Sequence, residues 1–414
     1  MRYIINKIIK SLLKIKYNKF IKYSFNISKK QEEILLSIIA KNCNSEYGKK
    51  HIFSDIKTIA EYQKTVPIVD YEDIETYILE MVSGKNEVLF SEKLTLIEET
   101  SGSTTNKKYI PYTSSLQKEY NKGIYTWLYD LLQSYNFLNG SLYFSITPKV
   151  KDNKNSSIIG FNDESEYIGI VGKIIKNFFA VPNDVKFIED EEKFKIVTCI
   201  FLFGRCDLSL ISIWNASFLL NLLKCFESNQ QIILNSIKER KILVDIDEKL
   251  KNKLNSYLVI NDERYDELTE VIDKYKYDYE KIFSNLKVIS SWGDSDSVYM
   301  YDKLKKIFPN TYVQKKGILA TEGVISIPFC NTEGHVITYL SHFYEFEDFE
   351  TGEVCLIQEL RENKRYKVII TTSGGLYRYR LGDIIEIKGY YNQIPIIKLI
   401  GRDKISDYVR RKNK

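Results

Sequence analysis

The chain has 414 residues, of which 60 are Lys or Arg and 55 are Asp or Glu, so its formal net charge is +5. Hydrophobic residues make up 44% and charged residues 28%, a globular composition that excludes a wholly disordered or fibrous chain. The charge is uneven, because residues 1–30 hold nine basic residues and no acidic one, and residues 401–414 hold six basic and two acidic ones. Residues 31–400 therefore carry a net charge of −8, which is not the profile of a nucleic-acid-binding domain.

The cysteines, the histidines and the missing motifs argue against several further classes of protein. The six cysteines are scattered and none forms a C-x-x-C pair, which is typical of a reduced cytoplasmic protein with mostly buried thiols. The three histidines give no local cluster with the spacing of a zinc site. The sequence has no G-x-S-x-G elbow, no complete Walker A motif and no G-x-G-x-x-G, which weakens hydrolase, P-loop and Rossmann interpretations.

The first predicted element is a basic amphipathic helix within residues 1–30. Ile and Leu recur at helical spacing through residues 4–13, with Lys7, Lys10 and Lys14 between them. Such a stripe most often packs on the folded domain, and we prefer that interpretation. The alternatives are a helix that lies on an anionic membrane surface and, more remotely, an organelle transit peptide. No apolar run is long enough to span a membrane.

Helices and strands are mixed through the rest of the chain. The hydrophobic pattern predicts helices over 31–40, 71–81, 116–135, 208–250, 263–278 and 301–307. Strands are predicted over 94–98, 141–147, 286–290, 312–315 and 324–327, and the chain becomes β-rich from Gly334, with strands over 336–340, 342–346, 352–359, 366–372 and 384–387. This mixture predicts an α/β fold with mixed sheets and helices, and no Ser/Gly-rich linker divides residues 31–400.

A hydroxyl-rich loop follows the strand predicted over 94–98. Residues 100–111 read TSGSTTNKKYIP, with five hydroxyl side chains around one glycine and two lysines directly after an asparagine. Hydroxyl and backbone N–H groups donate to phosphate oxygens, and a lysine adds a compact positive charge. On these residues alone, a phosphate-binding loop and an ordinary Ser/Thr-rich surface turn are equally good explanations.

The surrounding motifs favour phosphate binding, because residues 100–111 resemble the nucleotide loop of adenylate-forming ligases, in particular the auxin-responsive promoter family of acyl acid–amido synthetases. The resemblance continues in order along most of the chain. It is carried by NSEYG at 44–48, TVPIVDY at 65–71, SIWNASFL at 212–219, SWGD at 291–294, GILATEG at 317–323, TSGGLYRYRLGD at 372–383 and GR at 401–402. Several motifs in the correct order are far more specific than any one of them.

The resemblance implies the large N-terminal domain of the adenylate-forming fold, with mixed sheets flanked by helices and a β-rich end. We expect the basic helix over 1–30, a large adenylation domain over 31–400, and at 401–414 a hinge with the remnant of a small C-terminal domain. The rest of that small domain is expected to be lacking from this chain.

In the nucleotide loop, the resemblance implies contacts with the β- and γ-phosphates of ATP from Ser101, Gly102, Ser103, Thr104 and the catalytic Lys108. The family's loop usually carries another glycine where this chain has Thr105 or Asn106. A non-glycine residue at positive φ costs about 1–2 kcal/mol, so we expect this loop to be strained or differently shaped.

Four further residues complete the implied site. Thr321 would contact the α-phosphate, and Glu322 would hold Mg²⁺ and assist catalysis. Asp383 would accept hydrogen bonds from the ribose hydroxyls, and Arg402 would act on the same nucleotide from the hinge. Each has a plainer alternative, namely a turn cap for Glu322, a loop position for Asp383 and a surface ion pair for Arg402.

The implied function is ATP-dependent adenylation of a small carboxylic acid, followed by conjugation of the acyl group to an amine such as an amino acid. This chemistry needs positioning, Mg²⁺ and hydrogen-bond donors rather than a protein nucleophile, which suits a chain with three histidines. The acid would lie against Trp214, Phe218 and Trp292, although such aromatic residues are more often plain core.

The end of the sequence keeps other hypotheses open. The family continues past residues 401–407 into a small domain that closes over the site, whereas this sequence stops at Lys414. Unless a second polypeptide supplies that domain, we expect weak adenylation and failed amide formation; a fragment or a frameshifted gene would have the same appearance. The competing hypotheses are a catalytically inactive or partial adenylate-fold protein that binds nucleotide or a partner, and a scaffold on a membrane surface.

Overall fold

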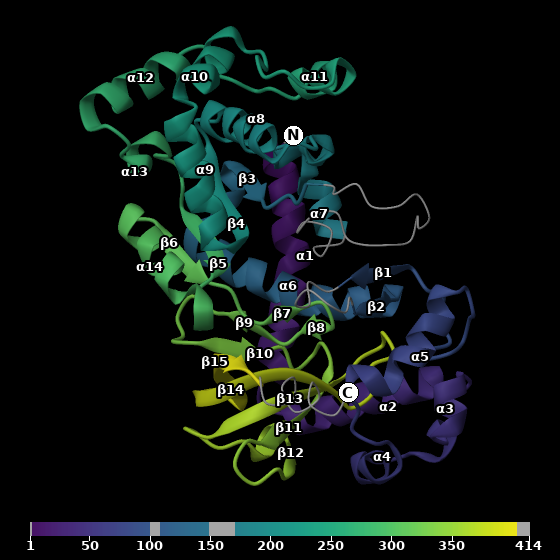
Figure 1. Ribbon diagram of the computed structural model, residues 1–414. Helices are drawn as coiled ribbons and strands as arrows, with labels where there is room; N and C mark the ends of the chain where they lie inside the picture. Colours follow the sequence, from purple (N-terminus) through teal and green to yellow (C-terminus); the bar gives the residue numbers. More distant parts are fainter. Residues whose placement is uncertain (1, 100–107, 149–169, 404–414) are drawn as a thin grey trace. The chain divides into compact units, whose positions relative to one another are not determined.

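The computed structural model describes residues 2–99, 108–148 and 170–403, which form two compact units (Figure 1). Unit 1 contains residues 2–10, 131–148 and 170–316, and unit 2 contains residues 11–99, 108–130 and 317–403. Two long helices, α1 (Arg2–Tyr23) and α6 (Ser114–Tyr135), contribute residues to both units. Within the described ranges, no helix has the length and apolar character needed to cross a membrane.

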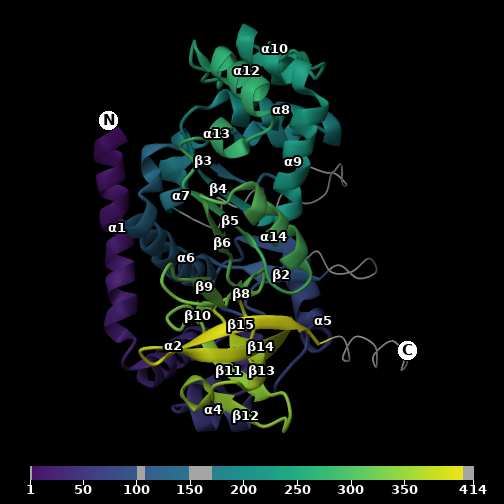
Figure 2. The same ribbon diagram turned by 90° about the vertical axis from the view of Figure 1, so that its left-hand side faces the viewer.

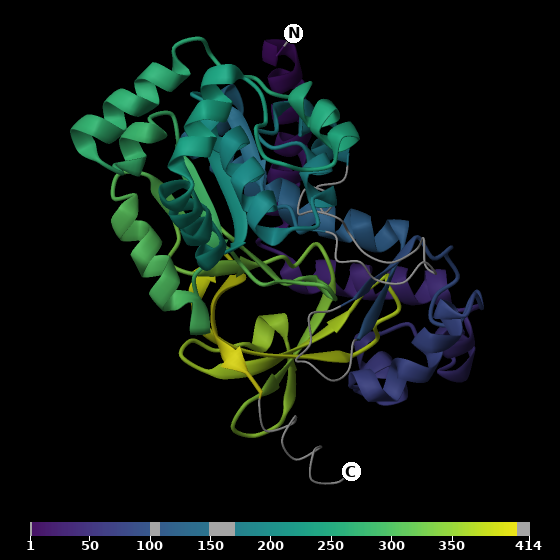
Figure 3. The same ribbon diagram turned by 45° about the horizontal axis from the view of Figure 1, so that its top comes forward.

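Unit 1 is built on a four-stranded parallel sheet with the order β3-β4-β5-β6. Because parallel strands need crossover connections, helices link them and pack around the sheet, as the teal and green ribbons of Figure 3 show. The apolar core lies between the sheet and these helices. The strands are β3 (Ser141–Phe144), β4 (Leu208–Asn215), β5 (Val288–Trp292) and β6 (Tyr312–Lys315), and the helices are α7 (Ile170–Ile175), α8 (Glu191–Gly204), α9 (Ala216–Ser228), α10 (Gln230–Glu239), α11 (Glu248–Asn255), α12 (Arg264–Tyr275), α13 (Tyr279–Ile282) and α14 (Val298–Ile307).

The structure corrects the helix predicted over 208–250. Its first eight residues, LSLISIWN, form the inner strand β4, and α9 begins only at Ala216. A strand buried on both faces reads as a continuous apolar run, so the period-2 signal that would separate it from a buried helix is missing. Asn215 marks the change, because its side chain caps α9 by accepting a hydrogen bond from the Ser217 N–H at 2.9 Å.

Unit 2 contains a seven-stranded antiparallel sheet with the order β12-β11-β13-β14-β15-β10-β9, which confirms the predicted β-rich end. Two hairpins, β1–β2 and β7–β8, accompany it. The remaining strands and helices are β1 (Leu96–Glu99), β2 (Tyr109–Tyr112), β7 (Leu319–Ala320), β8 (Gly323–Val324), β9 (Ser326–Pro328), β10 (His335–Ile337), β11 (Phe343–Asp348), β12 (Val354–Leu356), β13 (Arg365–Thr371), β14 (Tyr379–Tyr391), β15 (Ile394–Arg402), α2 (Ile27–Asn42), α3 (Glu46–Lys50), α4 (Ile59–Thr65) and α5 (Tyr71–Val82).

The long strands β14 and β15, drawn in yellow in Figure 2, differ most from the predicted strands of this region. The sequence predicted a strand over 384–387 only, whereas β14 has 13 residues and β15 adds nine more. They are joined by a two-residue turn in which Asn392 has φ 54°, a region that asparagine tolerates well. Their antiparallel register places Asp383 opposite Arg402, so two residues of the predicted site become neighbours.

Candidate active site

The tip of the β7–β8 hairpin carries Thr321 and Glu322. Ala320 pairs with Gly323, so these two residues form the whole turn. Two buried tyrosines fix its position from neighbouring elements. The Tyr112 hydroxyl donates to the Thr321 carbonyl, and the Tyr120 hydroxyl donates to the Ala320 carbonyl. The turn is therefore held by its backbone, which leaves the side chains of Thr321 and Glu322 available for other contacts.

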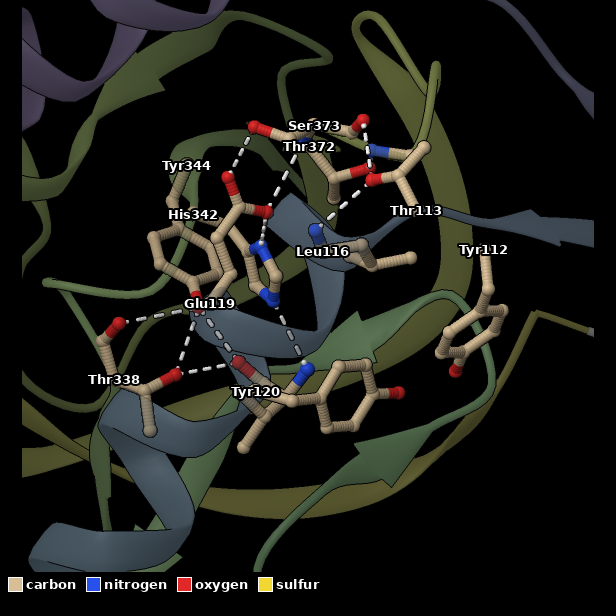
Figure 4. Close-up of polar contacts among 12 residues, drawn as sticks. Tyr112, Thr113, Leu116, Glu119, Tyr120, Thr338, His342, Tyr344, Thr372 and Ser373 are labelled. Carbon is tan, nitrogen blue, oxygen red and sulfur yellow. Dashed lines mark hydrogen bonds and ion pairs between the residues drawn. The ribbon is translucent and has the colours of Figure 1, made fainter. Parts of the chain in front are cut away.

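A buried polar network joins three segments beside this hairpin (Figure 4). Glu119 of α6 accepts hydrogen bonds from Ser373 Oγ at 2.5 Å and from the Ser373 N–H at 3.1 Å, and its Oε2 lies 3.0 Å from His342 Nδ1. On the other side of the ring, His342 Nε2 accepts the Val324 N–H at 3.1 Å. Because a backbone amide only donates, this bond assigns the imidazole proton to Nδ1, which donates to Glu119. The network thus fastens β8 to α6 and to the segment after β13.

The first residue of β8, Gly323, has no space for a side chain. A Cβ on Gly323 would lie 2.9 Å from His342 Nε2, which is closer than real Cβ atoms approach. The next carbonyl, that of Val324, lies within hydrogen-bond distance of the hydroxyls of Thr338 and Tyr344, whose oxygens are 2.8 Å apart and share two donor hydrogens with it. The hairpin that presents Glu322 is therefore fixed by hydrogen bonds from several neighbouring side chains.

Two buried carboxyl groups and one arginine form the charged part of the candidate site. Arg402 Nε donates to Asp383 Oδ1 at 3.0 Å. Asp383 and Glu322 are only 4% and 8% exposed, whereas the Arg402 side chain is 68% exposed. Burial raises the pKa of both carboxyl groups, and Arg402 lowers the pKa of both. The pKa of Glu322 is also raised by the charge of Asp383 and lowered by the charge of Lys108. The charged forms are under-compensated, so an additional cation beside Glu322 would be stabilised here.

Lys108 stands at the start of β2, directly before the hairpin strand that carries Tyr109. Its Nζ lies 5.1 Å from the centroid of the Tyr71 ring, an arrangement typical of a cation–π contact. Tyr71 is itself fixed, because its hydroxyl accepts the Tyr109 N–H at 2.9 Å. Lys108 thus lies in the same unit as Glu322, and its positive charge lowers the pKa of the Glu322 carboxyl group.

In unit 1, the carboxyl ends of the parallel strands bring two tryptophans together. Trp214 near the end of β4 and Trp292 at the end of β5 have ring centroids 5.5 Å apart. Lys316, which follows β6 directly, is buried and its Nζ lies 4.9 Å from the centroid of Trp214. Burial lowers the pKa of this amine. This is the edge of an open α/β sheet at which ligands commonly bind.

Comparison with protein families then identifies the chain. The model of the GH3 family N-terminal domain matches residues 16–313, and that of the GH3 family central domain matches residues 335–402. The chain belongs to the GH3 family. The class expected from the motifs, an adenylate-forming ligase of the acid–amido synthetase type, is thereby confirmed.

Individual GH3 relatives agree with this assignment. The chain is 23% identical over 419 residues to jasmonoyl–L-amino acid synthetase JAR4 of Nicotiana attenuata, covering 90% of this chain and 68% of the relative. It is also 23% identical over 409 residues to indole-3-acetic acid-amido synthetase GH3.2 of Arabidopsis thaliana, covering 91% and 74%. The structure of the AtGH3.15 acyl acid amido synthetase in complex with 2,4-DB matches with a TM-score of 0.84 at 19% identity, covering 95% of this chain and 71% of that one. The predicted fold class is confirmed.

The residues predicted for the GH3 site fall in three places. Those of the nucleotide site that the structure describes lie in unit 2: Lys108, Thr321, Glu322, Asp383 and Arg402. The aromatic residues predicted for the acid lie in unit 1: the paired Trp214 and Trp292, and Phe218, which is partly buried against the core. The loop residues lie outside the described ranges: Ser101, Gly102, Ser103 and Thr104. The roles assigned to all of them remain predictions.

Sequence reasoning missed Lys316 of unit 1 and the residues that hold the β7–β8 hairpin in place in unit 2. Ser373 lies inside the TSGG segment, and a closer look at that motif would have singled it out. Lys316 follows a predicted strand of a parallel sheet, which is a usable signal for a ligand-side residue. Glu119 and His342 have no local signal, because they are 223 residues apart and meet only in the folded unit.

Proposed function

We propose that this GH3 protein activates a small carboxylic acid with ATP and then transfers the acyl group to an amine such as an amino acid. Its family membership supports the overall reaction. The observation that carries the residue assignment is the cluster of Glu322, Asp383 and Arg402, where two buried carboxyl groups share a single exposed guanidinium. The curated relatives are named for jasmonic and indole-3-acetic acid conjugation, which makes these two acids the first candidates.

Mg²⁺ fits this cluster as the partner of Glu322. Mg²⁺ is commonly held by one or two carboxylates together with water and substrate phosphates, so a site of this kind needs no cage of protein ligands. Consistent with that, the described residues contain no group of three or more His, Cys, Asp or Glu side chains that could hold a metal ion. When bound, Mg²⁺ would neutralise charge on the phosphate oxygens as the reaction proceeds. Burial raises the pKa of Glu322, and a cation of this kind beside the carboxylate would stabilise its charged form.

The nucleotide would be oriented by residues around the same cluster. Asp383 can accept hydrogen bonds from vicinal hydroxyls, as a ribose presents, because Arg402 occupies only one of its oxygens among the described contacts. The exposed Arg402 guanidinium and the Lys108 amine would contact anionic oxygens. The Thr321 side chain would reach the α-phosphate from the fixed hairpin turn.

The chemical step then needs no protein nucleophile. The oxygen of the substrate carboxylate attacks the α-phosphorus, the bond to the β-phosphate oxygen breaks, and pyrophosphate leaves. Negative charge grows on phosphoryl oxygens, so the contribution of Lys108, Thr321 and Arg402 is fixed donors and positive charge. The acceptor amine subsequently attacks the acyl carbon and releases AMP. The acid itself would lie against Trp214 and Trp292, whose ring centroids are 5.5 Å apart near the carboxyl ends of β4 and β5.

Carboxylate-dependent exchange of labelled pyrophosphate into ATP tests the first half of this reaction. With Mg²⁺ and a panel of acids that includes jasmonic and indole-3-acetic acid, we expect exchange with at least one acid. Glu322→Gln should lower it by about 100-fold or more, because one charge-stabilising group of the transition state is lost. The exposed Glu333→Gln is the matched control and should leave exchange unchanged.

The same assay distinguishes an active ligase from a catalytically inactive protein that only binds nucleotide. Measurable ATP binding without exchange for any acid would favour a nucleotide-binding pseudoenzyme, and failure to bind ATP would overturn both. Amide formation is then measured separately, by adding amino acids and following the conjugate by mass spectrometry.

A further inference from the structure

Helix α1 has two apolar faces, and among the described residues only one of them is buried. Ile9, Leu13 and Phe20 are buried, with exposed fractions of 0–1%. Of the stripe predicted to pack on the fold, Ile9 and Leu13 are therefore buried, whereas Ile4, Ile8 and Leu12 are exposed. Figure 2 shows α1 as one continuous helix, so both faces run along the same element.

The second face consists of Ile4, Ile8, Leu12 and Ile15. They are 62%, 50%, 39% and 63% exposed, and all are far from the burial expected of branched aliphatic side chains. Their spacing of four, four and three residues places them in one line along the helix. We call these four residues the exposed stripe. A contiguous exposed apolar row of this kind is typical of an interaction surface.

The charges around the exposed stripe identify the kind of partner. The helix has seven basic residues and no acidic one. Helical geometry places Lys7 and Lys14 along one side of the exposed stripe and Lys16 along the other, and all three are exposed. Their aliphatic stems can extend beside the isoleucines while the ammonium groups contact anions.

We propose that the exposed stripe of α1 lies in the plane of an anionic lipid surface, with its isoleucines in the headgroup–acyl boundary and its lysines on the lipid phosphates. A nucleic acid would use the lysines but offers nothing for a row of isoleucines. A second copy of the chain would bring together two helices that each contain seven basic and no acidic residues, so like charges would repel. The charge complementarity therefore favours anionic lipid. The exposed stripe contains none of the residues assigned to the nucleotide site, so the inference stands apart from the proposed function.

Vesicle flotation of the full chain tests the proposal. We expect the protein to float with vesicles of phosphatidylcholine and phosphatidylserine at low salt and to be released as the salt concentration rises, because its lysine contacts are screened. Ile4→Ser, Ile8→Ser and Ile15→Ser combined should weaken partitioning by about tenfold or more, since buried apolar area is lost. The control is Val259→Ser with Tyr299→Ser, which removes exposed apolar side chains outside α1 and should leave flotation unchanged.

A second triple variant separates the lysines from the isoleucines. Lys7→Gln, Lys14→Gln and Lys16→Gln combined should weaken binding by about fivefold for each charge removed, and only on anionic vesicles. The control is Lys303→Gln, Lys305→Gln and Lys306→Gln, three exposed lysines of α14. Circular dichroism should show unchanged helix content in each variant.

Three results would overturn the proposal. The first is no flotation on anionic vesicles, and the second is equal flotation on pure phosphatidylcholine. The third is self-association by light scattering that disappears with the isoleucine variant, because the exposed stripe would then be an interface between copies. Pyrophosphate exchange measured on the same variants should be unchanged, so loss of flotation and loss of catalysis are distinguishable.

Discussion

Two arginine–carboxylate pairs in unit 2 are built in opposite ways. Arg378 donates from Nε and Nη2 to the two oxygens of Glu345 at 2.9 Å each, and from Nη1 to the carbonyls of Gln63 and Val66 at 2.8 Å each. The Arg402 pair has one hydrogen bond, from Nε to Asp383. We refer to the first as the closed pair and to the second as the open pair.

The closed pair and the open pair also differ in the exposure of their side chains and in backbone strain. The side chains of the closed pair are 8% and 1% exposed, so its charges are removed from water and compensated by hydrogen bonds on every side. Arg378 also has φ 50°, a conformation that an arginine adopts only when its surroundings determine it. In the open pair, the exposed arginine leaves donors directed away from its carboxylate. The same two functional groups therefore serve as an internal tie in one place and as a binding surface in the other.

Removing the arginine of the closed pair should have the largest effect on stability. Arg378→Ala leaves Glu345 buried without its partner and two carbonyls without donors, which should lower the free energy of unfolding by about 3–5 kcal/mol. Urea denaturation followed by tryptophan fluorescence measures this. The exposed Arg361→Ala is the control, expected to change stability by less than about 0.5 kcal/mol. A loss below about 1 kcal/mol in Arg378→Ala would contradict the idea that the closed pair is structural.

The network of Glu119, His342 and Ser373 should behave like the closed pair on a smaller scale. Ser373→Ala removes the 2.5 Å hydrogen bond from Oγ to Glu119 and leaves a buried carboxylate oxygen without that donor. We expect a loss of about 1–3 kcal/mol by denaturant titration. If instead stability were unchanged and only exchange activity fell, Ser373 would belong to the binding surface rather than to the support of the hairpin.

How far the sequence alone predicts this arrangement depends on how local each signal is. The motif GILATEG predicted the site residues Thr321 and Glu322, and the hairpin turn at the same place follows from residues close in sequence. The open pair depends on the register of β14 with β15, and Pro395 near the start of β15 weakens the pattern expected of an inner strand.

Burial and long-range contact are the features that local patterns leave out. The sequence of β4 predicts a helix because its two serines, Ser209 and Ser212, are three residues apart, so period-2 alternation is missing. Nothing near Glu119 in the sequence indicates that His342 and Ser373 will surround it, 223 and 254 residues later. The support of the site is therefore a property of the folded unit, whereas the motifs predict the site residues themselves, whose roles remain predictions.

The effect of Glu322 on stability should also differ from that of the closed pair. Because burial raises its pKa, the folded state binds the proton more tightly than the unfolded state. Above the folded pKa, the charged form therefore destabilises the fold, and this penalty disappears as the pH falls through the folded pKa to the unfolded value near 4.5. Glu322→Gln should thus raise the free energy of unfolding by about 0.5–2 kcal/mol at pH 7–8, as expected for a strained functional residue.

The gain from Glu322→Gln should shrink toward pH 4, which differential scanning fluorimetry across this range measures. Glu333→Gln provides the exposed control and should show no such pH-dependent gain. A destabilised Glu322→Gln at neutral pH would mean that this carboxylate, like Glu345, is an internal tie.

The smallest effect on stability is expected at Arg402, and it decides whether the open pair is functional. Arg402→Ala removes one hydrogen bond from an exposed side chain, so stability should change by less than about 1 kcal/mol even though Asp383 loses its partner. Pyrophosphate exchange should nevertheless fall by about tenfold or more, because a charge-assisted contact to the nucleotide is lost. Arg402→Lys should recover part of the exchange rate, since it restores the charge without the planar fork. Equal losses of stability in Arg402→Ala and Arg378→Ala would erase the distinction between the two pairs, because the exposed arginine would then be holding the sheet rather than a ligand.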